Sequence, residues 1–332
     1  MEGRLNVQQL PEYSDILDAA RRIAAEAVHT PLLENEVLNA RTGGRVLIKP
    51  ECLQRTGSFK FRGAYNRLSV IPAADRSRGV VAFSSGNHAQ GVACAAKLLG
   101  IPAIIVMPSD APKVKADGVR RYGAEIVAYD RERDDREAIA ATYVEERGMT
   151  LVPSYDDPFI VAGQGTCGLE IARSLENLNL TPDALVCCTG GGGLIAGIGL
   201  AMKHHFPQVE IWAAEPEGFD DHARSLAAGE RVSNARLGGS VQDALLTPSP
   251  GKITFALNQR QLTGAVQTTD DEALDAVAFA YAHLKLVAEP GGATALGAIL
   301  AGKIDVKDRT VVCVLTGGNV DPDIYRRALD RL

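Results

Sequence analysis

The sequence predicts an α/β protein with buried parallel strands and helices on both faces of each sheet. Short apolar runs alternate with amphipathic segments along the 332-residue chain, and most runs are followed by glycine, serine or asparagine. Uninterrupted apolar runs are typical of strands covered on both faces, and their alternation with helices is typical of βαβ units. Ligands of such sheets bind beyond the carboxyl ends of the strands, so the residues after each run are the first candidates for a site.

The expected elements follow one another along the chain. Strands are predicted at residues 45–50, 79–83, 102–107, 124–128, 184–188, 210–214 and 310–315. Helices are predicted at residues 13–27, 59–69, 89–98, after 112, and at 131–147, 194–205, 270–286 and 291–301.

Composition and charge exclude several classes of protein. The chain has 35 basic and 41 acidic residues, which gives a net charge of −6, so neither nucleic acid nor a membrane surface is an expected partner. No apolar run reaches the ~18–20 residues of a membrane span, and the polar N-terminus lacks a signal-peptide core. The six cysteines form no CxxC pair and are expected to be buried reduced thiols, which favours a cytoplasmic location.

Glycine is in excess, with 33 residues or roughly 10% of the chain. Gly190, Gly191, Gly192 and Gly193 lie between a strand and the helix that begins near Leu194. Free N–H groups at a helix N-terminus and bare backbone suit a phosphate. The same loop fits the G-x-G-x-x-A pattern of dinucleotide enzymes, with Glu215 placed as the ribose-binding acid, so a nicotinamide-dependent oxidoreductase stays an alternative here.

Three further segments at predicted strand or helix ends carry candidate site residues. Ser84, Ser85, Gly86, Asn87 and His88 open a helix, where N–H groups can bind a carboxylate or simply cap the helix. Thr316 ends the last strand beside glycines and can donate to a flat ligand. Lys60 lies between Phe59 and Phe61 at a helix start, and a lysine in an apolar pocket can attack a carbonyl.

Taken together, the chain resembles the fold-type II pyridoxal-phosphate enzymes (tryptophan synthase beta-like), in the branch of serine/threonine dehydratases and serine racemases. The matching segments in family order are 58–64, 84–88, 190–194 and 316–319, with 162–166 and 288–290 in support. The resemblance implies two open twisted parallel-sheet domains. Residues 1–55 and 152–332 would form the large domain, which binds pyridoxal phosphate, and residues 56–151 a small domain that closes over the substrate. A homodimer is also implied.

The resemblance further implies a role for each matched residue. Lys60 would carry pyridoxal phosphate as a Schiff base and act as general base, Gly190 to Gly193 and Leu194 would hold the phosphate, and Phe59 would pack on the ring. Asn87 and Glu289 would face the ring hydroxyl and Thr316 the ring nitrogen. The segment from Ser84 to His88 would bind the substrate carboxylate, and Ser85 aligns with the second catalytic residue of racemases.

The implied activity is α,β-elimination from a β-hydroxy amino acid such as L-threonine, L-serine or 3-hydroxyaspartate, giving a 2-oxo acid and ammonia. Racemisation of serine or a related amino acid, the dehydratase step of hydroxyectoine catabolism and a non-catalytic sensor remain alternatives. The family's usual substrate-side segment is replaced by residues 233–243, so Arg236, together with Arg136, is a candidate ligand for an additional acidic group of the substrate.

A divalent cation site is suggested at residues 215–221. Related racemases and dehydratases bind a cation through a glutamate, a carbonyl four residues later and an aspartate six residues later. Glu215, the Phe219 carbonyl and Asp221 have this spacing. Oxygen ligands of this kind suit Mg²⁺, Mn²⁺ or Ca²⁺.

Overall fold

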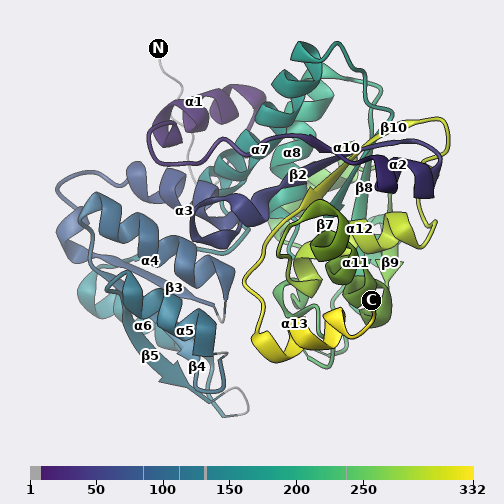
Figure 1. Cartoon of the computed structure of the whole chain (residues 1–332). Coiled ribbons are helices and arrows are strands. Elements are labelled where there is room, and N and C mark those ends of the chain that lie inside the picture. Colours follow the sequence, from purple (N-terminus) through teal and green to yellow (C-terminus); the bar gives the residue numbers. More distant parts are fainter. Residues whose placement is uncertain (1–8, 85, 112, 131–132, 237) are drawn as a thin grey trace.

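The larger of two sheets has six strands in the order β1-β2-β10-β7-β8-β9 (Figure 1). The computed structural model describes residues 9–84, 86–111, 113–130, 133–236 and 238–332. The strands of this sheet are β1 (Leu33–Glu34), β2 (Arg45–Pro50), β7 (Ala184–Cys188), β8 (Glu210–Pro216), β9 (Gly264–Thr268) and β10 (Thr310–Leu315). Only the pairing of β1 with β2 is antiparallel among these strands, and the other pairings are parallel.

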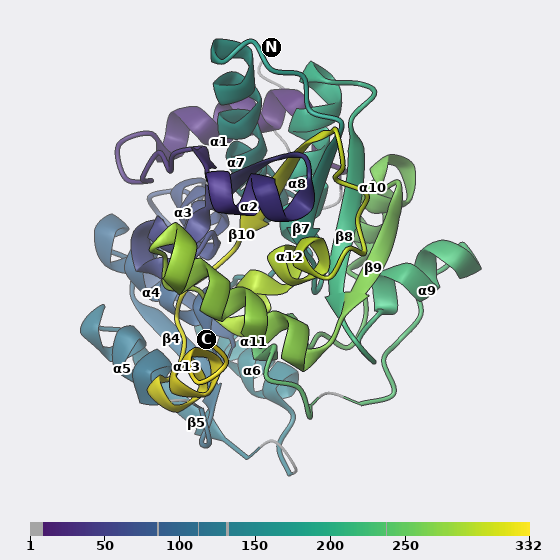
Figure 2. The ribbon, with the colours of Figure 1, turned by 45° about the vertical axis from the view of Figure 1, so that its right-hand side comes forward.

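Alternate residues of the central strands enter two different cores. On β10, Val311 and Cys313 pack with helices α11 and α12, whereas Val312 and Val314 pack with α7 and α8 on the opposite face. Figure 2 shows α11 and α12 in front of the sheet. The helices around this sheet are α1 (Tyr13–Ile23), α2 (Glu36–Thr42), α7 (Pro158–Asn177), α8 (Gly193–His205), α9 (Asp221–Ala228), α10 (Lys252–Gln261), α11 (Asp270–Phe279), α12 (Pro290–Leu300) and α13 (Pro322–Leu329).

The smaller sheet is wholly parallel, with the strand order β5-β4-β3-β6. Its strands are β3 (Val80–Phe83), β4 (Ala103–Pro108), β5 (Glu125–Tyr129) and β6 (Thr150–Leu151). The helices that accompany it are α3 (Lys60–Ser69), α4 (Asn87–Leu99), α5 (Lys113–Arg121) and α6 (Arg136–Arg147). One face packs against α3, α4 and α5 and the other against α6. The predicted α/β class with parallel sheets is therefore confirmed.

Several predicted boundaries were wrong for local reasons. The helix expected from residue 131 begins at Arg136, because the Asp135 side chain accepts hydrogen bonds from the N–H groups of Glu137 and Ala138 at 2.8 and 3.2 Å. Residues 131 and 132 lie outside the described part of the chain. The helix expected through residue 286 ends as an α-helix at Phe279 and continues as a π-turn over Ala280–Leu284. No described helix has the length and apolar character needed to cross a membrane.

Helices α3 and α7 approach each other so closely that two glycines meet at their contact. A Cβ atom added to Gly163 would lie 2.6 Å from the Cα atom of Gly63 and 2.7 Å from the carbonyl oxygen of Arg62. Distances below 3.0 Å force backbone to move, so side chains are excluded here. The contact fixes α3, which begins at Lys60, against the longest helix of the larger sheet.

Substitution of this glycine tests the contact. Gly163→Ala should lower the free energy of unfolding by about 1–3 kcal/mol, because overpacked helices must separate. Urea unfolding followed by circular dichroism measures the change. Gly238→Ala is the matched control, since a Cβ atom there would meet no atom within 4 Å. Equal unfolding midpoints for Gly163→Ala and the unsubstituted protein would contradict the prediction.

Candidate active site

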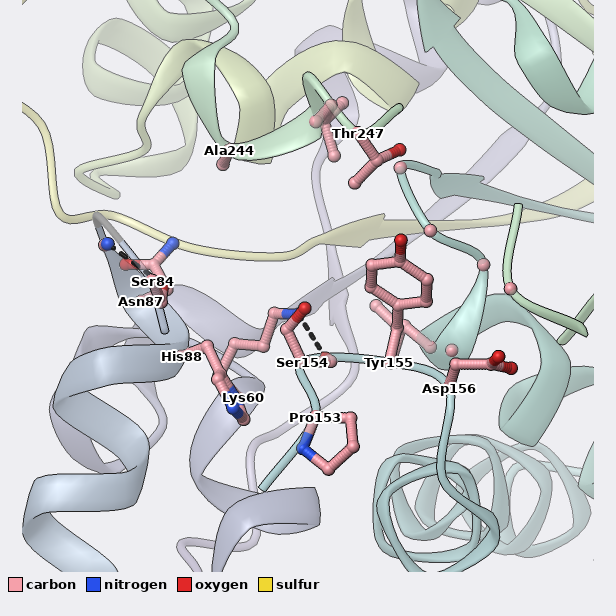
Figure 3. A pocket seen from close by; sticks show the side chains of 18 of the residues that line it. Lys60, Ser84, Asn87, His88, Pro153, Ser154, Tyr155, Asp156, Ala244 and Thr247 are labelled. Carbon is pink, nitrogen blue, oxygen red and sulfur yellow. Dashed lines mark hydrogen bonds between the residues drawn. The ribbon is translucent and has the colours of Figure 1, made fainter. Parts of the chain in front are cut away.

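A cavity of about 440 Å³ lies where the carboxyl ends of strands from both sheets converge. Its walls include residues that follow β3, β7 and β10, as expected for ligand sites of parallel sheets (Figure 3). The predicted site residues that line it are Phe59, Lys60, Ser84, Gly86, Asn87, His88, Arg136, Gly190, Gly191, Gly192, Gly193, Leu194 and Thr316. Segments more than 250 residues apart in the sequence thus meet at one pocket, as with Lys60 and Thr316. Ser85, which was expected beside them, lies outside the described residues.

Lys60 extends from the first turn of α3 into this cavity. Its Nζ donates a hydrogen bond to the carbonyl oxygen of Ser154 at 2.8 Å and lies 5.1 Å from the centre of the Phe59 ring (Figure 3). Burial lowers the pKa of the Lys60 amine to about 8. No carboxylate is paired with it among the described residues, so the neutral, nucleophilic form of the amine is accessible near neutral pH.

A buried ion network fixes the helix that carries Lys60. The guanidinium of Arg62 donates to both oxygens of Glu51 at 2.7 and 2.8 Å and to both oxygens of Glu170 at 2.7 and 2.8 Å. Lys49 also donates to Glu170, at 2.6 Å. Because bidentate pairs define both distance and orientation, this network sets the position of α3 relative to the strand β2 and helix α7.

The segment after β3 presents hydrogen-bonding groups at the N-terminus of α4. The Ser84 hydroxyl accepts from the Gly86 N–H at 3.2 Å, and Gly86 is the N-cap residue that precedes α4. His88 is buried, and its Nε2 lies 2.9 Å from the carbonyl oxygen of Val152. Burial, together with the positive charge of Lys60, lowers the pKa of His88 to about 3, so its ring is neutral. Because His88 is neutral, the free N–H groups of this helix N-terminus can bind a carboxylate, and the positive charge of Lys60 nearby acts in the same direction.

Asn87 lines the pocket, whereas Glu289 does not line it but is buried next to Asn87. The Asn87 amide donates to the Glu289 carboxylate and accepts from Asn319 Nδ2 at 2.8 Å. Burial raises the pKa of Glu289 to about 7, although the positive charge of Lys115 at 3.9 Å acts in the opposite direction. Lys115 is in turn paired with Asp243 at 2.5 Å. Glu289 Oε2 has no hydrogen-bond partner in the described residues, so this pair has unused capacity for a ligand hydroxyl.

The glycine loop between β7 and α8 is crowded on its outer side. A Cβ atom at Gly191 would lie 2.3 Å from the Tyr155 ring, and one at Gly192 would lie 2.5 Å from Nε2 of His222. Gly192 also has φ of +89°, which residues with side chains rarely adopt. Side chains are thus excluded, and the backbone N–H groups at the N-terminus of α8 remain available for an anion.

The pocket fits a flat phosphorylated ring that carries a carbonyl group. The desolvated amine of Lys60 can attack the carbonyl, the glycine loop can bind the phosphate, and Asn87 with Glu289 can bind a ring hydroxyl. Thr316 is buried at the end of β10 and supplies a neutral hydroxyl on the remaining side. These are the groups that pyridoxal phosphate requires, so the residues present fit that cofactor.

Of the two arginines predicted to contact the substrate, one lines the pocket and the other does not. Arg136 lines the pocket, and its guanidinium lies 5.2 Å from the centre of the Phe83 ring. Arg236 is exposed and is not one of the pocket-lining residues, because its guanidinium lies over the ring of Phe219 at 5.2 Å instead. Arg236 therefore does not line this cavity, and its role as a substrate ligand stays a prediction.

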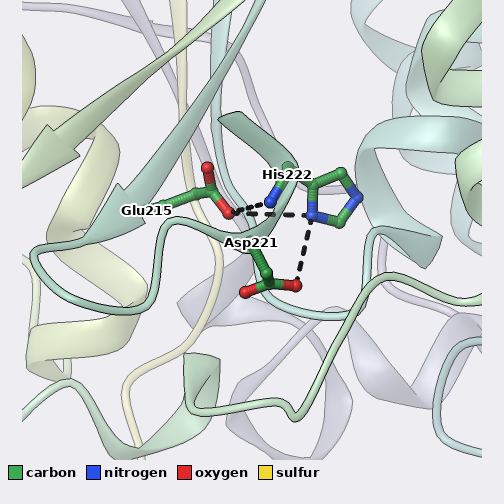
Figure 4. Close-up of side chains that lie close together, drawn as sticks. All are labelled: Glu215, Asp221 and His222. Carbon is green, nitrogen blue, oxygen red and sulfur yellow. Dashed lines mark hydrogen bonds and ion pairs between the residues drawn. The ribbon is translucent and has the colours of Figure 1, made fainter. Parts of the chain in front are cut away.

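Glu215 and Asp221 meet at a second buried cluster, together with His222, which sequence reasoning had not included (Figure 4). The ligand atoms of the three side chains lie within 4.8 Å of one another. Burial raises the pKa of Asp221 to about 6 and that of Glu215 well above its usual range, and it lowers the pKa of His222 to about 3. The two oxygens of Glu215 accept hydrogen bonds from the backbone N–H groups of His222 and Ala223. This carboxylate is therefore already engaged, which does not favour the alternative in which Glu215 binds the ribose of a dinucleotide.

Other pocket residues were missed because nothing in their local sequence marks them. Lys115, Ser154, Tyr155 and Asp156 come from a helix and a loop without a recognised pattern. Asp156 accepts from the N–H groups of Lys252 and Ile253 and so caps α10 beside the glycine loop.

Comparison with known proteins gives matches over nearly the whole chain. Residues 23–317 match the family model described as pyridoxal-phosphate dependent enzyme. The chain is 43% identical over 321 residues to an L-threo-3-hydroxyaspartate ammonia-lyase of a Pseudomonas species, covering 97% of this chain and 99% of the relative. It is 39% identical over 322 residues to a serine racemase of Schizosaccharomyces pombe, covering 97% and 98%. The structure of maize serine racemase superposes with a TM-score of 0.90 at 34% identity, covering 97% of this chain and 98% of that one.

The lowered pKa of Lys60 predicts how pH controls capture of the cofactor. With cofactor-free protein, the rate of covalent capture of pyridoxal phosphate should rise as the amine loses its proton, reach half its maximum near pH 8 and level off above about pH 9. Stopped-flow absorbance in the visible range, with borohydride trapping, measures this rate. Nα-acetyl-lysine, whose free side-chain amine has the ordinary pKa of about 10.4, is the control. A capture rate that still rises tenfold between pH 9 and pH 10 would show that Lys60 is not desolvated.

Proposed function

Because the chain belongs to the family of pyridoxal-phosphate dependent enzymes, we propose that it is an ammonia-lyase that converts a β-hydroxy amino acid into a 2-oxo acid and ammonia. The observation that carries this proposal is the amine of Lys60. It is desolvated, free of a carboxylate partner among the described residues, and placed in one pocket with the glycine loop and the N-terminus of α4. The similarity to the Pseudomonas ammonia-lyase supports the same class of reaction.

The residues of the chain have separable tasks in this reaction. Gly190 to Gly193 would hold the phosphate, Asn87 and Glu289 the ring hydroxyl, and Lys60 the carbonyl carbon of the cofactor. When bound, pyridoxal phosphate supplies a conjugated ring that withdraws electrons from the Cα–H bond of an amino acid. Ser84 and the N–H groups of α4 would bind the substrate carboxylate and so orient that Cα–H bond.

Proton transfer is assigned to Lys60. With the substrate bound, the Nζ of Lys60 would take the Cα proton as general base. The Cα proton and the β-hydroxyl group would in sum be lost as one water molecule, and addition of water to the released unsaturated amine would give the 2-oxo acid and ammonia. Thr316, which is buried and lines the pocket, would present a neutral hydroxyl to the ring of the cofactor where a carboxylate would present a negative charge.

For the substrate, we propose a 3-hydroxyaspartate. Arg136 places a guanidinium on the pocket wall, which can pair with a second carboxylate that serine and threonine lack. The amino-acid substrate is a small molecule, and the pocket volume of about 440 Å³ accommodates it together with the cofactor ring.

A panel of amino acids tests the activity and the substrate together. Purified holoenzyme is given L-serine, L-threonine, D-serine and both 3-hydroxyaspartates, and the products are scored for 2-oxo acid, ammonia and inversion at Cα. We expect the highest kcat/KM for a 3-hydroxyaspartate. Inversion without release of ammonia would favour a racemase instead, and no product from any member of the panel would contradict an ammonia-lyase.

Arg136→Gln should raise the KM for 3-hydroxyaspartate by about 10- to 100-fold, the loss expected for one charge-assisted hydrogen bond, with a much smaller effect on L-serine. Arg147→Gln is the matched control. Arg147 lies at the other end of α6 and also stacks on an aromatic ring, that of Tyr143, but it does not line the pocket. An equal loss for L-serine and 3-hydroxyaspartate would contradict the assignment of Arg136.

We also propose that Glu215, the Phe219 carbonyl and Asp221 bind a divalent cation such as Mg²⁺, Mn²⁺ or Ca²⁺. The burial of both carboxyls beside each other supports a compensating positive charge. Excess chelator should therefore lower both the activity and the melting temperature, because an ion that binds only the folded protein stabilises it. Asp221→Ala should do the same, whereas Asp220→Ala, whose partners are Arg224 and Gln267, is the control. Full activity in excess chelator would contradict the site.

Three further proposals concern organisation. Residues 56–151 would move as a small domain that closes the pocket. The ion pair between Lys115 on α5 and Asp243 on the other side of the cavity supports this movement.

The enzyme would act as a homodimer, as the resemblance implies. Its six free cysteines, five of them buried, support a reducing and hence cytoplasmic environment.

A further inference from the structure

The imidazole of His222 stands between the buried carboxylate cluster and the glycine loop of the pocket. Its Nδ1 lies 3.7 Å from Oε1 of Glu215 and 3.9 Å from Oδ2 of Asp221. Its Nε2 lies 3.2 Å from Nδ2 of Asn258, which donates to the carbonyl oxygen of Gly192 at 3.4 Å. One ring nitrogen therefore faces the two carboxylates (Figure 4). The other faces Asn258 and the glycine loop.

Two polar atoms in the cluster lack hydrogen-bond partners among the described residues. They are Nδ1 of His222 and Oδ2 of Asp221, and both side chains are fully buried. The other carboxylate oxygens are used, because Glu215 accepts from two backbone N–H groups and Oδ1 of Asp221 accepts from Asn234 at 2.7 Å. Buried polar atoms normally have a hydrogen-bond partner or another ligand. Two buried atoms without partners that lie close together therefore point to a ligand that binds both.

The spacing of these atoms suits a metal ion. Two ligands at about 2.1 Å from one ion are separated by at most about 4.2 Å. The distances of 3.7 and 3.9 Å from Nδ1 to the two carboxylate oxygens lie within this limit. Imidazole is a ligand that suits transition metals, whereas Mg²⁺ and Ca²⁺ prefer oxygen.

We propose that His222 Nδ1 is a third side-chain ligand of the cation site. The site therefore prefers a divalent transition metal over Mg²⁺ and Ca²⁺. Through His222, binding of the cation also changes the hydrogen bonding of the glycine loop. This inference rests on the cation site of the proposed function and changes its ligand set. It gives His222 a role that the spacing of Glu215, Phe219 and Asp221 does not include.

The link to the loop follows from the hydrogen atom on the ring. When Nδ1 binds an ion, the proton lies on Nε2, which then needs an acceptor. A half-turn of the Asn258 side-chain amide presents its oxygen to Nε2 and withdraws the amide N–H from the Gly192 carbonyl. Gln261 loses one acceptor in this rearrangement but keeps its bond to the Ala196 carbonyl at 2.9 Å. Metal binding thus alters the hydrogen bonding of the glycine that bounds the phosphate site.

The ligand is identified directly in the unsubstituted holoenzyme. After removal of metal with a chelator, the protein is loaded with Mn²⁺ and examined by pulsed electron paramagnetic resonance. We expect one bound Mn²⁺ whose signal shows ¹⁴N modulation from a histidine, and this modulation is lost when the protein is labelled with [¹⁵N]histidine. Bound Mn²⁺ without ¹⁴N modulation overturns the inference but leaves the oxygen-ligand site intact. Failure of Mn²⁺ to bind overturns both.

Metal preference and the link to the loop are measured separately. The ratio of the Kd for Mg²⁺ to that for Co²⁺ should be about 100 or more and should fall at least tenfold in His222→Leu. His204→Leu, at the exposed end of α8, is the control.

The ³¹P chemical shift of the bound cofactor should change when Zn²⁺ is added, and this change should be absent in Asn258→Ala. An unchanged ratio in a folded His222→Leu, or an unmoved ³¹P signal in the unsubstituted protein, contradicts the corresponding part of the inference.

Discussion

The position of the reactive lysine depends on a guanidinium that is completely buried. Arg62 lies two residues after Lys60, and its charge is shared between Glu51 and Glu170 through paired hydrogen bonds. Burial opposes the ionisation of Glu51, yet the guanidinium holds the pKa of that carboxyl below its ordinary value. Because an unpaired buried charge would cost several kcal/mol, these groups can only be buried together. The start of α3 is thereby joined to the end of β2 and to α7.

This constraint separates the charges of the site into two zones. On the side of α3 that faces β2 and α7, the buried cations Arg62 and Lys49 have carboxylate partners: Arg62 pairs with Glu51 and Glu170, and Lys49 also pairs with Glu170. On the side that faces the cavity, the amine of Lys60 donates to the carbonyl of Ser154 and has no carboxylate partner among the described residues, so burial lowers its pKa. The same helix therefore carries a permanently charged residue that fixes its place and a lysine that is poised to lose its proton. The glycine contact at Gly63 and Gly163 brings α3 and α7 close enough for these pairs to form.

The sequence predicted the parallel sheets and most of the pocket, because both depend on local patterns. Apolar runs identified β2, β7 and β10 with their observed limits, and the glycine loop and Lys60 lie in one cavity as expected. The longest helix, α7, was missed because Gly163, Gly165 and Gly168 interrupt a helical pattern; in the structure they allow close packing against α3, α1 and α8.

The remaining differences concern contacts between distant segments. Lys115 reaches Asp243 over 128 residues, and nothing near either one in the sequence indicates the pair. Arg236 was expected at the pocket, but its attraction to the face of the Phe219 ring places it elsewhere. His222 was overlooked because the spacing rule applied to Glu215 and Asp221 counts oxygen ligands alone. Long side chains choose partners in three dimensions, and a linear pattern does not contain that choice.

Electrostatics connect the two buried sites. The glycine loop, for which we propose a phosphate-binding role, presents neutral N–H groups at the start of α8, where the helix dipole favours an anion. Directly behind this loop, separated by one imidazole, lie the carboxyls of Glu215 and Asp221. If both were ionised and uncompensated, their field would oppose the negative phosphate across a medium of low dielectric constant. A divalent ion between them would remove that opposition, so occupancy of the cluster and retention of the phosphate should favour each other.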